Sequence, residues 1–126
     1  MKEILAPISL GELMDKITIL EIKCKHLQGR ALHHVRTELQ ALEKVSATLD
    51  LEIDPELIED LRQVNQSLWR IEDAIREQES RKTFGDEFIQ LARLVYREND
   101  QRAAIKKAIN ARYGSSLIEE KSYRDY

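Results

Sequence analysis

Between residues 86 and 113, apolar side chains recur every three or four residues, which is the period of one face of an α-helix. Near the middle of this seam, the positions where it should continue hold Glu98, Asn99 and Arg102 instead. A seam that faces a protein core accommodates such groups only if they are paired or hydrogen-bonded. The interruption therefore predicts either a structural polar cluster between helices or a binding site, and the residues leave both open.

Three more segments share this period, and we expect each to form a helix. Ser9 and Glu12 have the spacing of a capping box at the start of the first, and Gly29 follows its end, where a left-handed cap is favoured. Asp54 and Pro55 are a typical N-cap and first residue for the third. The three expected helices cover about residues 9–28, 31–49 and 55–82.

We predict an all-α fold, an antiparallel helical bundle of about four helices, in a single domain over residues 1–126. The chain has 34% charged and only 6% aromatic residues, which fits a helical protein. The third and fourth helices, about 27 residues each, should form a long hairpin that overhangs the first two, which are nearer 20 residues. The exposed apolar length predicts a homodimer. The tail, residues 114–126, has no clear period and is expected to be extended.

Charge and composition narrow the function classes. The net charge is −3, with 20 basic and 23 acidic side chains, so no nucleic acid is expected as a partner. The single Cys24 rules out an internal disulfide framework and suits a reducing compartment. No signal peptide is apparent, and no stretch approaches the roughly 18–20 apolar residues of a membrane span. We therefore expect a cytoplasmic protein without a membrane span.

On the fourth helix, Tyr96, Asn99, Arg102 and Lys106 share one face with part of the apolar seam. In a functional interpretation, Arg102 and Lys106 grip a phosphate or carboxylate while Asn99 and Tyr96 orient it. In a structural interpretation, Arg102 pairs with a carboxylate on the third helix, such as Glu72, and fixes the register of the two helices. The structural interpretation is the simpler one.

The other two long seams carry matching polar residues. On the third helix, Trp69 is most simply an apolar anchor whose N–H needs a partner, and Asn65 is the kind of residue that specifies helix register. A ligand contact is the alternative for both. Asp15 and Glu21 on the first helix are further counterparts of the interrupted seam. These residues together predict a polar layer between three helices.

Metal and catalytic motifs are weak in this sequence. Glu12 with Asp15, and Glu56 with Glu59, are carboxylate pairs that could hold magnesium, as in all-helical nucleotide pyrophosphohydrolases. Both pairs lie in first helical turns, however, where the helix dipole alone favours them. There is no glycine-rich phosphate loop or nucleophile elbow. We therefore expect no metal, no cofactor and no catalytic residue.

Three stretches carry a family resemblance: GELMDKITILEIK, VNQSLWRIEDAIR and LARLVYRENDQRAAIK. With them, nearly the whole chain resembles a bacterial family of small helical proteins of unknown function. The resemblance implies a setting near surface-polysaccharide or glycosyltransferase pathways, and it brings no established catalytic residue. Together with the spacing arguments it selects these candidate ligand-binding residues: Asp15, Glu21, Asn65, Trp69, Glu72, Arg93, Tyr96, Asn99, Arg102 and Lys106.

Three functional hypotheses follow. The leading one is a non-catalytic binding or adaptor protein that contacts a protein partner, or an anionic small molecule, through the polar face of the third and fourth helices. The tyrosine-rich tail would be a second contact region. The rival is a small helical enzyme in which Arg93, Arg102 and Lys106 bind an anionic substrate and Glu72 or Asp73 acts as acid or base. The third is a magnesium-dependent nucleotide pyrophosphohydrolase-like bundle. A closed pocket where these charges converge would favour an enzyme.

Overall fold

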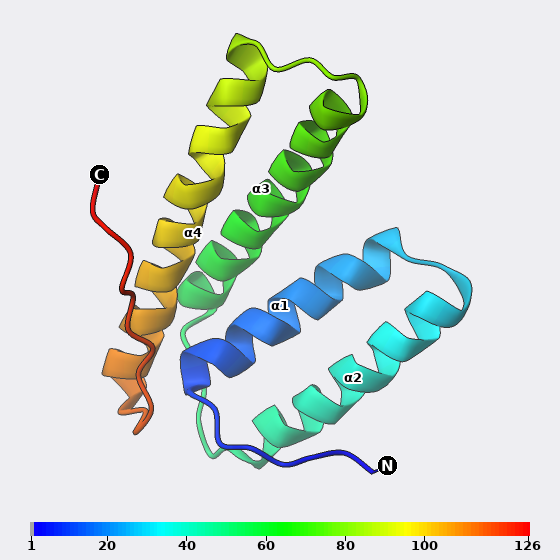
Figure 1. Cartoon of the computed structure of the whole chain (residues 1–126). Coiled ribbons are helices and arrows are strands. Elements are labelled where there is room, and N and C mark those ends of the chain that lie inside the picture. The colour runs from blue at the N-terminus through cyan, green and yellow to red at the C-terminus, as the bar shows by residue number, and fades with distance from the viewer. Residues whose placement is uncertain (1) are drawn as a thin grey trace.

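The computed structural model describes residues 2–126, which contain four α-helices and, within that range, no strand. Consecutive helices run antiparallel, so the chain consists of two hairpins (Figure 1). The predicted all-α bundle with a long hairpin of the third and fourth helices is confirmed. The helices are α1 (Leu10–His26), α2 (Gly29–Thr48), α3 (Pro55–Ser80) and α4 (Asp86–Tyr113).

The capping signals at the two ends of α1 act differently from the prediction. The Ser9 hydroxyl accepts the Glu12 backbone N–H at 3.1 Å, as a capping box requires. The Glu12 carboxylate does not return the bond, because it binds Lys106 on α4 instead. Gly29 has the expected positive φ of 63°, but it is the first residue of α2, whereas Leu27 caps α1.

The predicted limits of α3 and α4 are largely confirmed. The Asp54 side chain accepts the Glu56 backbone N–H at 2.9 Å, and Pro55 is the first residue of α3. The α4 helix ends at Tyr113 and is capped by Gly114, whose φ of 66° is the left-handed conformation that glycine adopts without steric cost. The α3 helix ends two residues before the predicted limit, at Ser80.

The central element is α1, which contacts all three other helices. Within the described chain, α2 contacts α1 alone, and none of the residues 29–48 is buried. Figure 1 shows α1 lying across one end of the α3–α4 hairpin, with α2 on its outer side. The leucine stripe of α2 therefore forms an outer layer that is only half covered. None of the helices between residues 2 and 126 is long and apolar enough to cross a membrane.

The apolar core lies where α1 crosses the hairpin. Leu13 and Met14 of α1 pack with Leu61 of α3 and Ile109 of α4, and the last two are fully buried. The helices of the α3–α4 hairpin have 26 and 28 residues, against 17 and 20 in the other hairpin. The tip of the long hairpin consequently projects beyond α1, as the helix lengths predicted (Figure 1).

A glycine allows the close crossing of α1 and α4. A Cβ atom at Gly11 would lie 2.5 Å from the Lys106 carbonyl oxygen. The Gly11 N–H donates to Asn110 Oδ1 at 2.7 Å, and the Leu10 N–H donates to Ser115 Oγ at 3.3 Å. Backbone N–H groups in the first turn of a helix have no partner within the helix. The C-terminal end of α4 thus supplies acceptors for the N-terminus of α1.

We expect Gly11→Ala to lower the free energy of unfolding by about 1–3 kcal/mol, because the added methyl group meets backbone that cannot rotate away. Urea denaturation monitored by circular dichroism measures this change. Gly85→Ala is the matched control, because its Cβ would meet no atom within 4 Å. Equal stability of the Gly11→Ala variant and the natural chain would contradict the close crossing.

Candidate functional site

A polar layer joins α1, α3 and α4 at the interruption of the α4 seam. The Asn65 amide nitrogen donates to Asp15 Oδ1 and to Thr18 Oγ1, each at 2.9 Å. The Asn65 oxygen accepts from Arg102 Nη1 at 3.2 Å, and Arg102 Nη2 donates to Asn99 Oδ1 at 2.8 Å. A single amide on α3 therefore links α1 to α4.

The expected ion pair between Arg102 and Glu72 is wrong. Glu72 accepts from Arg76 Nε at 3.2 Å, one turn further along α3. Arg102 is held by two neutral amide oxygens instead, and within residues 2–126 it forms no ion pair. A guanidinium has five N–H donors, and its positive charge is not neutralised by an amide. Arg102 consequently keeps N–H donors that these amides do not use, and its positive charge is not compensated by a carboxylate.

Lys106, by contrast, is surrounded by carboxylates. Its side chain is only 8% exposed, and Nζ lies 2.6 Å from Glu12 Oε2, 2.7 Å from Glu119 Oε2 and 3.7 Å from Asp15 Oδ2. Burial alone would lower the pKa of Lys106, but the hydrogen bonds to Glu119 and Glu12 and the charge of Asp15 outweigh it, so the pKa lies above its usual 10.5. Lys106 is therefore a neutralised structural cation and is not free to hold an anion beside Arg102.

An open groove of about 580 Å³ runs past Arg102 between α1, α3 and α4. Side chains of α1 and α3 make one wall apolar, and the polar layer forms its other end. Glu72, Asp73 and Arg76 also contribute to its lining. The groove thus brings an apolar surface and an unpaired guanidinium together. The apolar wall consists of Ile19, Ile22, Leu68 and Trp69, and the polar end consists of Asn65, Asn99 and Arg102.

Trp69 has an unusual environment in this groove. Its ring stacks on His26 of α1, with the ring centroids 4.6 Å apart and the planes inclined by 19°. Its Nε1 is buried without a hydrogen-bond partner among the described residues. A buried donor left unpaired is costly, and the partner that we expected for this N–H is not supplied by residues 2–126.

The remaining candidate residues lie apart from the groove. Glu21 pairs with Arg62 at 3.2 Å, and Arg62 also binds Glu59 at 2.6 Å, so these residues form a separate network between α1 and α3. Arg93 is exposed on the projecting part of α4 and does not line that groove. Tyr96 stacks edge-on against Tyr126, with the centroids 5.0 Å apart.

Two contacts of the site were not predicted from the sequence. Glu119 reaches Lys106 from the tail, and His26 covers one face of Trp69. The only sequence signal for the first contact was that acidic residues in the tail follow paired lysines on α4. Nothing in the sequence signalled the second, because it depends on how far α1 is shifted along α3.

The magnesium hypothesis gains no support from the carboxylates. Among residues 2–126, no three or more His, Cys, Asp and Glu side chains come together in a way that could hold a metal ion. The Lys106 ammonium already lies between Glu12 and Asp15, in the place that a cation would occupy. Glu59, from the second predicted pair, is bound to Arg62 instead.

Comparison with known proteins identifies the family but not the activity. The model of a family of unknown function, DUF6165, matches residues 4–125, so this chain belongs to that family. The predicted membership in a family of unknown function is confirmed. No curated protein and no solved structure matches the chain.

We expect Lys106→Met to lower the free energy of unfolding by about 3 kcal/mol at pH 7, because Glu12 and Asp15 would lose the cation between them. Lys107→Met is the matched control, because the Lys107 side chain is 61% exposed and its removal should cost at most about 1 kcal/mol. Equal losses in the two variants, measured by urea denaturation, would contradict a structural role for Lys106.

The pKa of Lys106 gives this contribution a pH dependence. Because the folded pKa is raised, the contribution is complete below the unfolded pKa of about 10.5 and is lost as the pH rises through the folded value. The stability of the natural chain should therefore fall more steeply above this pH than that of Lys106→Met. Parallel urea titrations of both chains at rising pH measure the difference, and parallel curves would contradict the raised pKa.

Proposed function

We propose that this chain is a non-catalytic binding protein that captures an anionic group of a partner in the groove between α1, α3 and α4. The observation that carries the proposal is the Arg102 guanidinium, held in position by Asn65 and Asn99 but not neutralised by either. Two amide acceptors orient a guanidinium while leaving its charge available to a ligand. Preorganisation of this kind reduces the entropy lost on binding.

The lining of the groove also indicates the chemical character of the rest of the ligand. Its wall of Ile19, Ile22 and Trp69 offers apolar contact beside the cation. A carboxylate or phosphate matches the fork of an arginine side chain, and an adjoining apolar group would cover the wall. The proposed ligand is therefore an amphipathic anion, either a side chain presented by a protein partner or a small molecule.

The enzyme hypothesis has weaker support from the same groove. A general acid or base has to reach the substrate in a site that excludes water. Glu72, one of the two candidates, is 47% exposed and bound to Arg76, and the groove is open to solvent. Binding without catalysis accounts for the observed side chains with fewer assumptions. The proposed setting is the bacterial cytoplasm, in surface-polysaccharide or glycosyltransferase pathways, and it rests on the family resemblance and composition alone.

We also propose that the chain forms a homodimer. Its accessible surface is 9265 Å², whereas a compact monomer of 14.7 kDa exposes roughly 6,900 Å². The extended termini account for part of the excess, and the projecting hairpin accounts for more. Phe84 and Ile89 near its tip are about half exposed. An excess of this size is comparable with the area that stable homodimers bury.

Arg102→Gln should weaken the binding of an amphipathic anion at least tenfold, because glutamine keeps polar contacts in the layer but removes the charge. Anilinonaphthalene sulfonate, which combines an aromatic ring system with one anionic group, is the probe. Trp69 is the only tryptophan, so quenching of its fluorescence reports binding in this groove.

The matched control is Arg93→Gln, which removes an exposed arginine of the same helix outside the groove. Its affinity for the probe should equal that of the natural chain. If Arg102→Gln loses the helical circular-dichroism signal, Arg102 is a structural residue and the proposed function fails. Arg102→Lys keeps the charge without the planar fork and should retain part of the affinity.

Sedimentation equilibrium of the natural chain should give twice the mass of one copy. Ile89→Glu places a charge on the projecting part of α4, where the fold does not bury it, and should shift the equilibrium toward monomer without changing the helical signal. The control Val45→Glu makes the same change on α2, at a side chain of similar exposure. A monomeric natural chain at micromolar concentration would rule out the proposed homodimer.

A further inference from the structure

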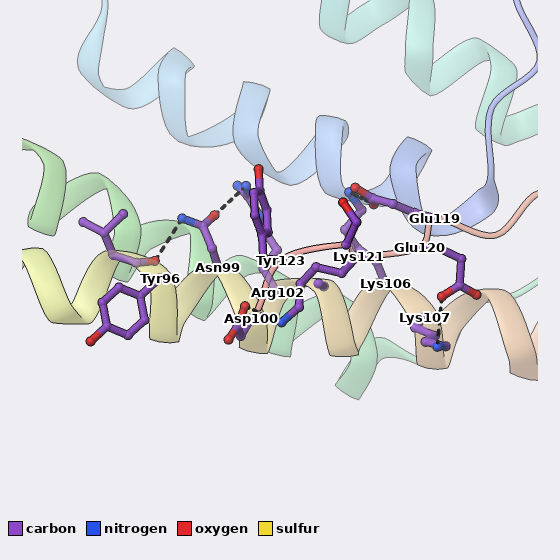
Figure 2. A pocket seen from close by; sticks show the side chains of 13 residues that line it. Tyr96, Asn99, Asp100, Arg102, Lys106, Lys107, Glu119, Glu120, Lys121 and Tyr123 are labelled. Carbon is purple, nitrogen blue, oxygen red and sulfur yellow. Dashed lines mark hydrogen bonds and ion pairs between the residues drawn. The ribbon is translucent and has the colours of Figure 1, made fainter. Parts of the chain in front are cut away.

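The C-terminal tail lies along α4, where Arg102 lines both the groove and the space beside the tail. It runs back from the end of α4 in an extended conformation (Figure 1). Figure 2 shows the labelled side chains of Glu119, Lys121 and Tyr123 over the stretch of α4 that carries Asn99 and Lys106. A cavity of about 610 Å³ remains between this helix and the tail. The tail thus occupies a surface that is hollow enough to accept a peptide.

Charged side chains hold the tail in register with α4. Hydrogen bonds from Lys121 and then Tyr126 lower the pKa of Asp100, and the Tyr126 ring also meets Tyr96 at 5.0 Å. Two carboxylates and one cation of the tail therefore each meet an opposite charge of the helix. The three ion pairs are Glu119–Lys106 at 2.7 Å, Glu120–Lys107 at 3.7 Å and Lys121–Asp100 at 2.6 Å.

This attachment is weak for its length. Within the described chain, no backbone hydrogen bond joins residues 116–126 to α4. The side chains of Glu119 and Glu120 are 57% and 75% exposed, and the Glu120–Lys107 pair, which is exposed at both ends, contributes little to stability. Ile118 and Tyr123 leave most of their surface in solvent instead of packing. A competing segment with the same charges can therefore displace the tail at small cost.

We propose that this face of α4 is a peptide-binding site for an extended segment in which two carboxylates precede a cation, and that the tail is its intramolecular occupant. Lys106, Lys107 and Asp100 would contact the incoming charges, as they now contact the tail. A tethered occupant competes at a high effective concentration, so a partner binds only in proportion to the fraction of chains whose tail is released. The tail would thus regulate access to α4.

This site is distinct from the groove of the proposed function. Its charged contacts are Lys106, Lys107 and Asp100, none of which lines that groove. Only Asn99 and Arg102 line both cavities. The peptide site can therefore exist whether or not Arg102 captures an anion, and the experiments on the two sites use different probes.

The test compares full-length chains that differ in the tail. The probe is a fluorescein-labelled peptide with the sequence of residues 117–126, and fluorescence anisotropy measures its binding. Combining Glu119→Gln, Glu120→Gln and Lys121→Gln removes the three ion pairs and releases the tail. If the natural tail is closed nine-tenths of the time, this triple variant should bind the peptide about tenfold tighter than the natural chain.

Two further variants make the result specific. Arg124→Gln changes an exposed charge of the tail outside the three pairs, so its affinity should equal that of the natural chain. Asp100→Asn, added to the triple variant, removes the partner of the peptide's lysine and should weaken binding several-fold. Equal affinity of the natural chain and the triple variant, no binding by the triple variant, or no effect of Asp100→Asn would each overturn the proposal.

Discussion

The Asn65 amide is the interaction on which the arrangement of the three inner helices depends. It is 4% exposed, and it donates toward α1 while accepting from α4. An amide can make both kinds of bond, whereas a carboxylate in this place would repel Asp15 and an apolar residue would leave Asp15 Oδ1 and Arg102 Nη1 without the bonds that now join the helices. Because its partners lie on two other helices, Asn65 fixes their offset along α3. A polar residue inside a helical interface has this effect on register in coiled coils also.

Because Asn65 is neutral, it leaves the positive charge of Arg102 uncompensated. Had Glu72 been its partner, the guanidinium would have been neutralised and the groove would have lost its cation. Asp15 is turned toward Asn65 and Lys106, so its negative charge balances the lysine instead. The layer thus divides into a neutralised half around Lys106 and a positively charged half around Arg102. The structural interpretation of the interrupted seam therefore describes Lys106, whereas the proposed function concerns Arg102 alone.

The sequence was sufficient to predict the helix ends, which depend on local backbone and side-chain preferences. It was insufficient to predict how far one helix is shifted along another. Asp54, Pro55 and Gly114 mark helix ends through their own backbone and side-chain preferences, and those limits were predicted well. Asn65 and Glu72 lie on one stripe of α3, roughly 10 Å apart along its axis. Periodicity cannot choose between them as the partner of Arg102, because the shift of α4 along α3 is set by three-dimensional contacts. For the same reason the leucine stripe of α2 did not reveal that this helix packs on α1 alone.

The two ends of α1 are held with different strength, and this difference bears on the groove. Its N-terminal end is fixed by the contact at Gly11, the bond to Asn110 and the Glu12–Lys106 pair. At its C-terminal end, His26 stacks on Trp69, which is a softer contact than a buried hydrogen bond. The groove is lined from α1 by Ile19 and Ile22, which lie in the half of the helix nearer this softer end. Under the proposed function, a ligand acceptor could reach the buried Trp69 N–H only if α1 moved at this end, so binding would be coupled to a local conformational change.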